Sequence, residues 1–153
     1  FRKQRLDMYR STSPRPTVIN TLNRLRSAGI KVGLISDCGF ELPAIWDGLS
    51  LAPHIDAKVF SCLEGVRKPD AKVYHLVCER LSVRPSRCLY VGDGGSRELT
   101  GALEVGMQPV LIRVGYESHM DAFREDALKW KGPVISDISE VLEHVGLNGA
   151  DKS

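Results

Sequence analysis

The sequence lacks several features that would assign it to a class at once. No apolar run approaches the roughly 20 residues of a membrane-spanning helix, and residues 1–5 lead into no signal-peptide core. The formal net charge is only +2, with lysine and arginine spread evenly, which argues against a nucleic-acid partner. The histidines show no metal-ligand spacing, and the cysteines include no Cys-x-x-Cys pair. We therefore expect a cytoplasmic protein with reduced thiols and neither membrane nor nucleic acid as a partner. The sequence gives no indication of its oligomeric state.

What the chain does contain is a regular alternation of two patterns. Its 153 residues, 42% of them hydrophobic, suffice for one domain with a proper core. Short apolar runs predict strands, and apolar residues at helical spacing between them predict helices. The strands are expected at residues 30–35, 57–60, 88–91, 109–114 and 133–135. This alternation predicts an α/β domain with a parallel sheet and right-handed crossovers.

Two of the predicted helices near the end of the chain have recognisable start signals. Ser118 and Asp121 have the spacing of a capping box, which predicts a helix with Phe123 and Ala127 facing inward. A second box of this kind opens a last helix over residues 137–145.

The most informative stretch is Cys88–Glu98. A run of β-forming residues stops at Gly92-Asp93-Gly94, which places the Asp93 carboxylate just past the carboxyl end of a buried parallel strand. Open α/β sheets bind their ligands at that edge. Asp93 and Glu98, five positions apart near exposed backbone N–H groups, suit a hard cation such as Mg²⁺ that holds a phosphate. A purely conformational turn is the alternative, since Gly-Asp-Gly ends many strands.

Two further loops follow predicted strands and carry polar side chains. Ser36 ends the strand at residues 30–35, and Lys68 stands immediately before a helix in the loop that follows residues 57–60. Because the carboxyl ends of parallel strands share one edge of the sheet, both side chains should converge with Asp93. Taken singly, Ser36 could be a helix cap and Lys68 a solvated loop charge.

In the order hydroxyl, lysine, acidic loop, these residues resemble the haloacid dehalogenase (HAD) superfamily of hydrolases. Leu34-Ile35-Ser36 is similar to its second motif, Arg67-Lys68-Pro69-Asp70 to its third, and Val91-Gly92-Asp93 through Glu98 to its fourth. The glycine spacing over residues 101–107 resembles what commonly follows the fourth motif. The resemblance covers residues 14–146 and implies a Rossmannoid parallel sheet with helices on both faces.

The resemblance also implies roles for these residues. An aspartate nucleophile would form an aspartyl-phosphate, which water then hydrolyses. Asp93 would hold Mg²⁺, Ser36 would donate to a phosphoryl oxygen, and Lys68 would neutralise charge shared by nucleophile and phosphate. Glu98 would reach a metal-bound water or orient Lys68. Asp37 stands where many members have asparagine, and it is expected to point away.

One family motif is not found in these residues. The family's first strand ends in Asp-x-Asp and lies in the middle of the sheet, between the strands that end at Ser36 and Asp93. Asp7 follows no apolar run and has no second acid two positions later. We therefore expect the chain to correspond to the carboxyl-terminal two-thirds of such a protein, with a sheet that lacks its central strand. Residues 1–13 would be a remnant of the cap or its linker, and residues 147–153 a disordered tail.

Several functions are compatible with this reading. The first is a Mg²⁺-dependent phosphatase that acts on a small phosphorylated metabolite, with the nucleophile outside this chain. A catalytically inactive module that binds phosphate or a partner protein is the second. Dehalogenation by the same kind of nucleophile is a third, although it needs no metal and so leaves the acidic loop unexplained. A flavodoxin-like receiver or nucleotide-binding domain ranks below these, because the sequence has no P-loop.

Overall fold

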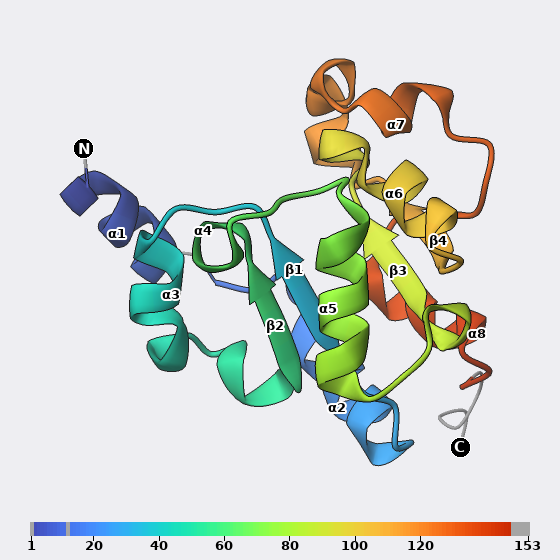
Figure 1. Cartoon of the computed structure of the whole chain (residues 1–153), viewed down its shortest axis with the longest axis horizontal. Helices are drawn as coiled ribbons and strands as arrows, with labels where there is room; N and C mark the ends of the chain where they lie inside the picture. Colours follow the sequence, from blue (N-terminus) through green and yellow to red (C-terminus); the bar gives the residue numbers. More distant parts are fainter. Residues whose placement is uncertain (1, 12, 148–153) are drawn as a thin grey trace.

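The computed structural model describes residues 2–11 and 13–147 (Figure 1). Its strands form two parallel sheets. In the first sheet, β1 (Gly33–Ser36) pairs with β2 (Ala57–Phe60). In the second sheet, β4 (Gln108–Ile112) lies between β3 (Leu89–Gly92) and β5 (Val134–Ile135). The predicted strands are thus all present, although β1 begins three residues later than the sequence pattern suggested.

Helices cover both faces of these sheets. The helix α5 (Ala71–Leu81) packs on β1 and β2, and α6 (Glu98–Glu104) packs on β3 and β4. The opposite face is covered by α2 (Val18–Ser27) and α8 (Val141–His144), which lie behind the strands in Figure 1. The α/β class with helices on both faces, expected from the sequence, is confirmed.

The alternation of side chains along β3 shows why both faces are covered. Tyr90 packs into the cluster formed by α5, whereas Leu89 and Val91 pack into the cluster formed by α2 and α8. Successive strand residues point to opposite faces, so an apolar residue at every position needs a helix on each side. Burying side chains such as Val59 and Val73, both fully inaccessible, contributes roughly 1.5–3 kcal/mol each.

The two sheets do not merge into one. Within the described residues no ladder joins β1 to β3, so each strand leaves one edge without a strand partner. Shared hydrophobic clusters hold the sheets together instead: Ile35 of β1 and Tyr90 of β3 both pack against the cluster around Val77. The interruption falls between the strands that end at Ser36 and Asp93, where the sequence indicated it.

The amino-terminal residues form a helix that no sequence pattern predicted. Residues 2–11 form the helix α1 (Arg2–Ser11), which contacts α3 (Glu41–Ile45). The sequence there shows no apolar period, but it is composed largely of residues with good helix propensity. Periodicity alone therefore missed this helix.

The segment after β4 also differs from the prediction. Residues 115–123 form the 3₁₀ stretch η5 (Gly115–Phe123), followed by the short helix α7 (Glu125–Lys129). Ala127 is buried as expected, but Phe123 is 79% exposed. Asp121 caps no helix; its carboxylate pairs with Arg113 at 3.0 Å. The predicted capping box at Ser118 was wrong, because Asp121 pairs with Arg113 and Arg124 instead of capping a helix in residues 115–123.

The end of the described chain follows the prediction more closely. Asp137 and Glu140 form a complete capping box at the start of the 3₁₀ turn η6 (Ile138–Glu140), which leads into α8. The expected tail lies outside the described residues except for Leu147, whose N–H donates to the Leu142 carbonyl. None of the helices described is long and apolar enough to cross a membrane. The remaining short elements are η1 (Trp46–Gly48), η2 (Ala52–His54), α4 (Ser61–Glu64), η3 (Pro85–Arg87) and η4 (Gly95–Arg97).

Candidate active site

Asp93 is the first residue after β3, at the carboxyl edge of the sheet. Its Oδ1 accepts a hydrogen bond from the Gly95 N–H at 3.0 Å, which fixes the carboxylate within the turn. Gly94 has a φ of +87° and lies against the Ala127 backbone, so a side chain at that position would be both strained and obstructed. The Asp93 side chain stays 46% exposed. Partial burial alone would raise the pKa of Asp93, but the Gly95 N–H and neighbouring side chains including Arg124 hold it below its ordinary value.

Glu98 opens α6 and is buried beneath the Asp93 turn. Its Oε2 accepts from the Lys68 ammonium at 2.7 Å and from the Tyr90 hydroxyl at 2.9 Å. Its Oε1 accepts from the Gly94 N–H at 3.1 Å. A Cβ at Gly92 would come within 2.3 Å of Oε1, so glycine is what admits this carboxylate. Burial raises the pKa of Glu98, and the Lys68 ammonium and the Tyr90 hydroxyl offset part of that effect.

Lys68 links the acidic turn to the loop after β1. Its ammonium contacts Glu98, and its backbone N–H donates to the Asp37 Oδ1 at 3.2 Å. The expectation that Asp37 points away was therefore wrong, because its carboxylate supports the lysine loop. A depression of about 560 Å³ adjoins Lys68, lined among others by Ser61, Cys62 and Val66.

Ser36 is the last residue of β1 and is partly buried. It lies at the same sheet edge, directly before Asp37, so the loops that carry Ser36, Lys68 and Asp93 are joined by hydrogen bonds through Asp37 and Glu98. The Ser36 hydroxyl also contributes to the surroundings of Cys38, whose pKa burial raises to about 11. A thiol with so high a pKa is protonated at neutral pH and is a poor nucleophile.

Several residues of this cluster were not predicted from the sequence. The Tyr74 hydroxyl donates to the Glu98 carbonyl at 2.8 Å, and its ring stacks edge-on against Tyr90 at 5.5 Å. Arg124 contacts Asp93 at 3.1 Å from far along the chain. Tyr90 could have been found from strand alternation, which places it on the α5 face, whereas no local pattern marks Arg124.

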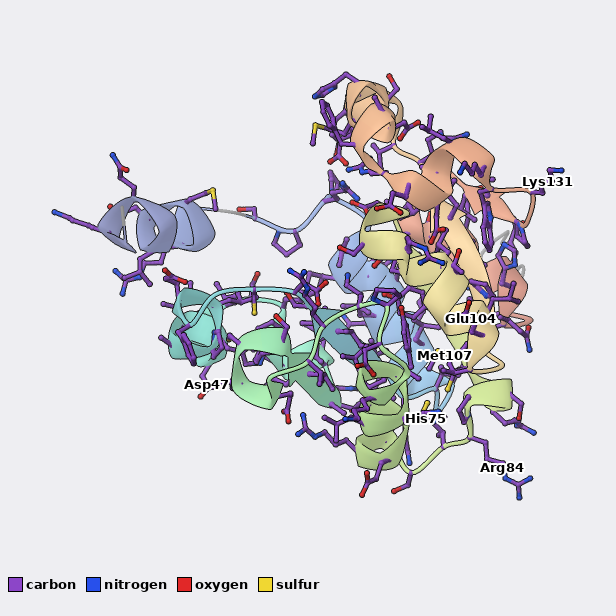
Figure 2. The ribbon with its side chains drawn as sticks, turned by 45° about the horizontal axis from the view of Figure 1, so that its top comes forward. Asp47, His75, Arg84, Glu104, Met107 and Lys131 are labelled. Carbon is purple, nitrogen blue, oxygen red and sulfur yellow. The ribbon has the colours of Figure 1, made fainter. Side chains whose placement is uncertain are left out.

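Of a divalent cation's ligands, the acidic turn can supply one, the Asp93 carboxylate. The described residues contain no group of three or more His, Cys, Asp or Glu side chains that could hold a metal ion, and His75 lies exposed on α5 (Figure 2). Glu98 is buried and already accepts hydrogen bonds from three donors. Asp93 offers a partly exposed carboxylate in the acidic turn, and the exposed Asp37 carboxylate is engaged by the Lys68 N–H. Mg²⁺ commonly binds through one or two carboxylates together with water and phosphate oxygens, so Asp93 suits one such ligand.

A second hollow of about 580 Å³ lies elsewhere on the domain. Its lining includes Thr100, Leu103 and Trp130, and excludes Lys68 and Asp93. Lys131, at its rim, extends outward from the domain (Figure 2). The predicted site residues thus lie in the loops that carry Ser36, Lys68 and Asp93, which we call the loop cluster, and none of them lines this hollow.

A parallel α/β sheet whose carboxyl edge combines a lysine with an acidic turn is the arrangement that the sequence resemblance implied. Comparison with known proteins agrees. The family model for haloacid dehalogenase-like hydrolases matches residues 3–106. The chain belongs to this family.

Individual relatives carry two kinds of name. A glyceraldehyde 3-phosphate phosphatase of Methanopyrus kandleri is 35% identical over 74% of this chain and 49% of its own length. An (S)-2-haloacid dehalogenase of Burkholderia cepacia is 31% identical over 70% of this chain and 46% of its own. The crystal structure of a HAD phosphatase from Thermococcus onnurineus superposes with a TM-score of 0.73 at 25% identity, over 86% of this chain and 58% of that one. The chain thus spans about half the length of the relatives it matches.

Proposed function

We propose that the full-length protein is a Mg²⁺-dependent phosphatase that hydrolyses a small phosphorylated metabolite of the cytoplasm through an aspartyl-phosphate. The observation that carries the proposal is the Lys68–Glu98 pair beside Asp93: Glu98 holds the ammonium at 2.7 Å in the loop cluster that also presents a half-exposed carboxylate. A fixed positive charge close to an acid that can take a cation is what a phosphoryl group requires.

Each residue has a distinct task in this proposal. Lys68 neutralises the charge of a phosphoryl oxygen and of the attacking carboxylate, and the Ser36 hydroxyl donates a hydrogen bond to a second phosphoryl oxygen. Glu98 positions Lys68, and Asp37 fixes the lysine backbone. Asp93 contributes one ligand to Mg²⁺, which when bound offsets the repulsion between two anions. The nucleophile is an aspartate that we do not assign among these residues.

The names of the relatives suggest where to look for substrates. Glyceraldehyde 3-phosphate is the first compound to assay, because it is what the Methanopyrus kandleri relative is named for. Dehalogenation is the second candidate function, favoured by the name of the Burkholderia cepacia relative. The acidic turn at Asp93 argues for the phosphatase, since displacement of a halide from carbon by a carboxylate requires no cation.

Release of phosphate and of halide by the purified full-length protein tests the proposal. We expect hydrolysis of para-nitrophenyl phosphate and glyceraldehyde 3-phosphate with Mg²⁺, and no chloride from (S)-2-chloropropionate. Asp93→Asn should remove most activity, and Lys68→Met should lower kcat on the order of 100-fold. Lys72→Met, which removes an exposed lysine from α5, is the matched control and should leave turnover unchanged.

The other outcomes separate the alternatives. Full activity of the Asp93→Asn protein would overturn the role of Asp93. Chloride release without phosphate release would identify a dehalogenase. Absence of both reactions, with inorganic phosphate still bound, would indicate the non-catalytic module.

A further inference from the structure

Arg124 reaches Asp93 from the segment between η5 and α7. Its Nη2 lies 3.1 Å from the Asp93 Oδ2, the oxygen opposite the one bound by Gly95. The Arg124 side chain is only 11% exposed although its partner is 46% exposed. In Figure 1 this segment, drawn in orange, lies above the carboxyl end of β3. Both oxygens of the Asp93 carboxylate therefore have a donor or a positive charge beside them.

Two other carboxylates hold the guanidinium in this place. Glu117 accepts from the Arg124 Nη2 at 2.9 Å, and Asp121 lies 3.6 Å from its Nη1. Glu117 is itself held by Arg15, whose Nη2 is 2.5 Å from its other oxygen. Arg124 thus lies among three acids, two of which, Glu117 and Asp121, belong to the preceding stretch η5. Those two would keep it paired if it withdrew from Asp93.

We propose that Arg124 is a positioning residue that competes with a divalent cation for Oδ2 of Asp93 and thereby sets the cation affinity of the acidic turn. The inference rests on the proposed function, because it takes Asp93 as a metal ligand. It goes beyond that function in assigning the control of cation binding to a residue outside the four family motifs.

The competition follows from charge and distance. A guanidinium paired with a carboxylate oxygen at 3.1 Å occupies space from which a cation would approach that oxygen, and two positive centres near one oxygen repel each other. The pair is shielded from solvent on the arginine side, so screening by water weakens this repulsion less than at an open surface. Binding of a cation should therefore require Arg124 to turn toward Glu117 and Asp121. Removing the guanidinium should make cation binding tighter.

Titration calorimetry with Mg²⁺ and Mn²⁺ on the full-length protein tests this without relying on turnover. We expect Arg124→Gln to bind each cation roughly tenfold more tightly than the unmodified protein, the size expected when a partly buried charge-assisted contact no longer has to be broken. The matched control is Arg113→Gln. This substitution also removes one positive charge beside Asp121, but the Arg113 guanidinium pairs with Asp121 rather than Asp93. The cation affinity of this variant should therefore stay within about twofold of that of the unmodified protein.

A second measurement needs no variant and covers the case in which Arg124→Gln fails to fold. In ¹⁵N NMR of the unmodified protein, the Arg124 Nε signal should move on addition of Mg²⁺ with the same midpoint as the calorimetric titration. A purely structural arginine would keep its signal.

The outcomes distinguish this inference from the proposed function. Equal affinity of Arg124→Gln and the unmodified protein, an equal gain in Arg113→Gln, or an unmoved Arg124 signal at saturating Mg²⁺ would overturn the competition while leaving Asp93 as a ligand. Absence of cation binding in every protein, with phosphatase activity that ignores Mg²⁺, would overturn both.

Discussion

Lys68 and Glu98 form an ion pair that is nearly out of contact with solvent: Nζ lies 2.7 Å from Oε2, and the two side chains are 14% and 6% exposed. Because burial costs each charge its hydration, the pair is tolerated only while both members are present. Tyr90 and the Gly94 N–H complete the hydrogen bonds of the glutamate. The pair joins the lysine loop to the acidic turn, so stability and site geometry depend on the same contact.

Removing the glutamate should therefore cost far more than removing its tyrosine partner. We expect Glu98→Ala to lower the free energy of unfolding by about 3–5 kcal/mol, because the Lys68 ammonium is left without its counter-charge. Tyr90→Phe removes one hydrogen bond and should cost about 1 kcal/mol. Urea unfolding followed by circular dichroism measures both. Equal costs would show that the ion pair carries no special weight.

Gly101 permits the close approach of α6 to the lysine loop. A Cβ at Gly101 would lie 2.6 Å from the Tyr74 hydroxyl and 2.9 Å from the Pro69 carbonyl oxygen, so backbone would have to move. Gly→Ala within a helix ordinarily stabilises by about 1 kcal/mol, but here we expect Gly101→Ala to destabilise by about 1–3 kcal/mol. Gly115→Ala is the control, since no atom lies within 4 Å of its added Cβ, and it should change stability by less than about 0.5 kcal/mol. Thermal denaturation of both variants shows whether Gly101→Ala lowers or raises the stability of the fold.

The residues that could be predicted from the sequence are those whose positions follow from local pattern. The apolar run before Asp93 predicted where β3 ends, and with it the place of the Asp93 carboxylate at the sheet edge. The predicted helix after Lys68 is α5, and the Asp70 side chain caps its start. The contacts that complete the site join residues far apart in the chain. Arg124 lies 31 positions beyond Asp93, and nothing in its neighbourhood shows that it would turn back. Local periodicity also failed for residues 115–123, where ion pairs determine the path.

Asp126 illustrates the same point and supports a further prediction. Arg97, the N-cap residue of α6, makes no side-chain hydrogen bond to the helix. The first N–H groups of α6 are capped instead by Asp126, whose Oδ2 accepts from the N–H groups of Leu99 and Thr100 at 2.8 and 3.0 Å. Asp126→Ala should lower the free energy of unfolding by about 2–3 kcal/mol, because these buried donors lose their acceptor. Thr100→Val removes only the hydroxyl contact to Asp126 and should cost about 1 kcal/mol. Urea denaturation measures both variants, and equally small losses in the free energy of unfolding would contradict the capping role of Asp126.

The pH dependence of stability should reflect Asp137. The hydroxyl and N–H of Ser139 and the hydroxyl of Thr17 hold the pKa of Asp137 below its ordinary value. A carboxylate whose pKa is lower in the folded state stabilises the fold above its unfolded pKa, and that contribution disappears as the pH falls through the folded pKa. Asp137→Asn keeps an acceptor at the cap but removes the charge, so it should be less stable than the unmodified protein by about 0.5 kcal/mol at neutral pH. The difference should shrink as the pH drops below about 4.

Unfolding by urea at a series of pH values from neutral to acid measures this difference directly. Thr17→Val removes one of the donors while leaving the titrating carboxylate, so it should show a smaller loss at neutral pH and keep part of the acid dependence. A constant difference between Asp137→Asn and the unmodified protein at every pH would mean that the capping box acts by geometry alone and that the Asp137 charge contributes nothing to stability.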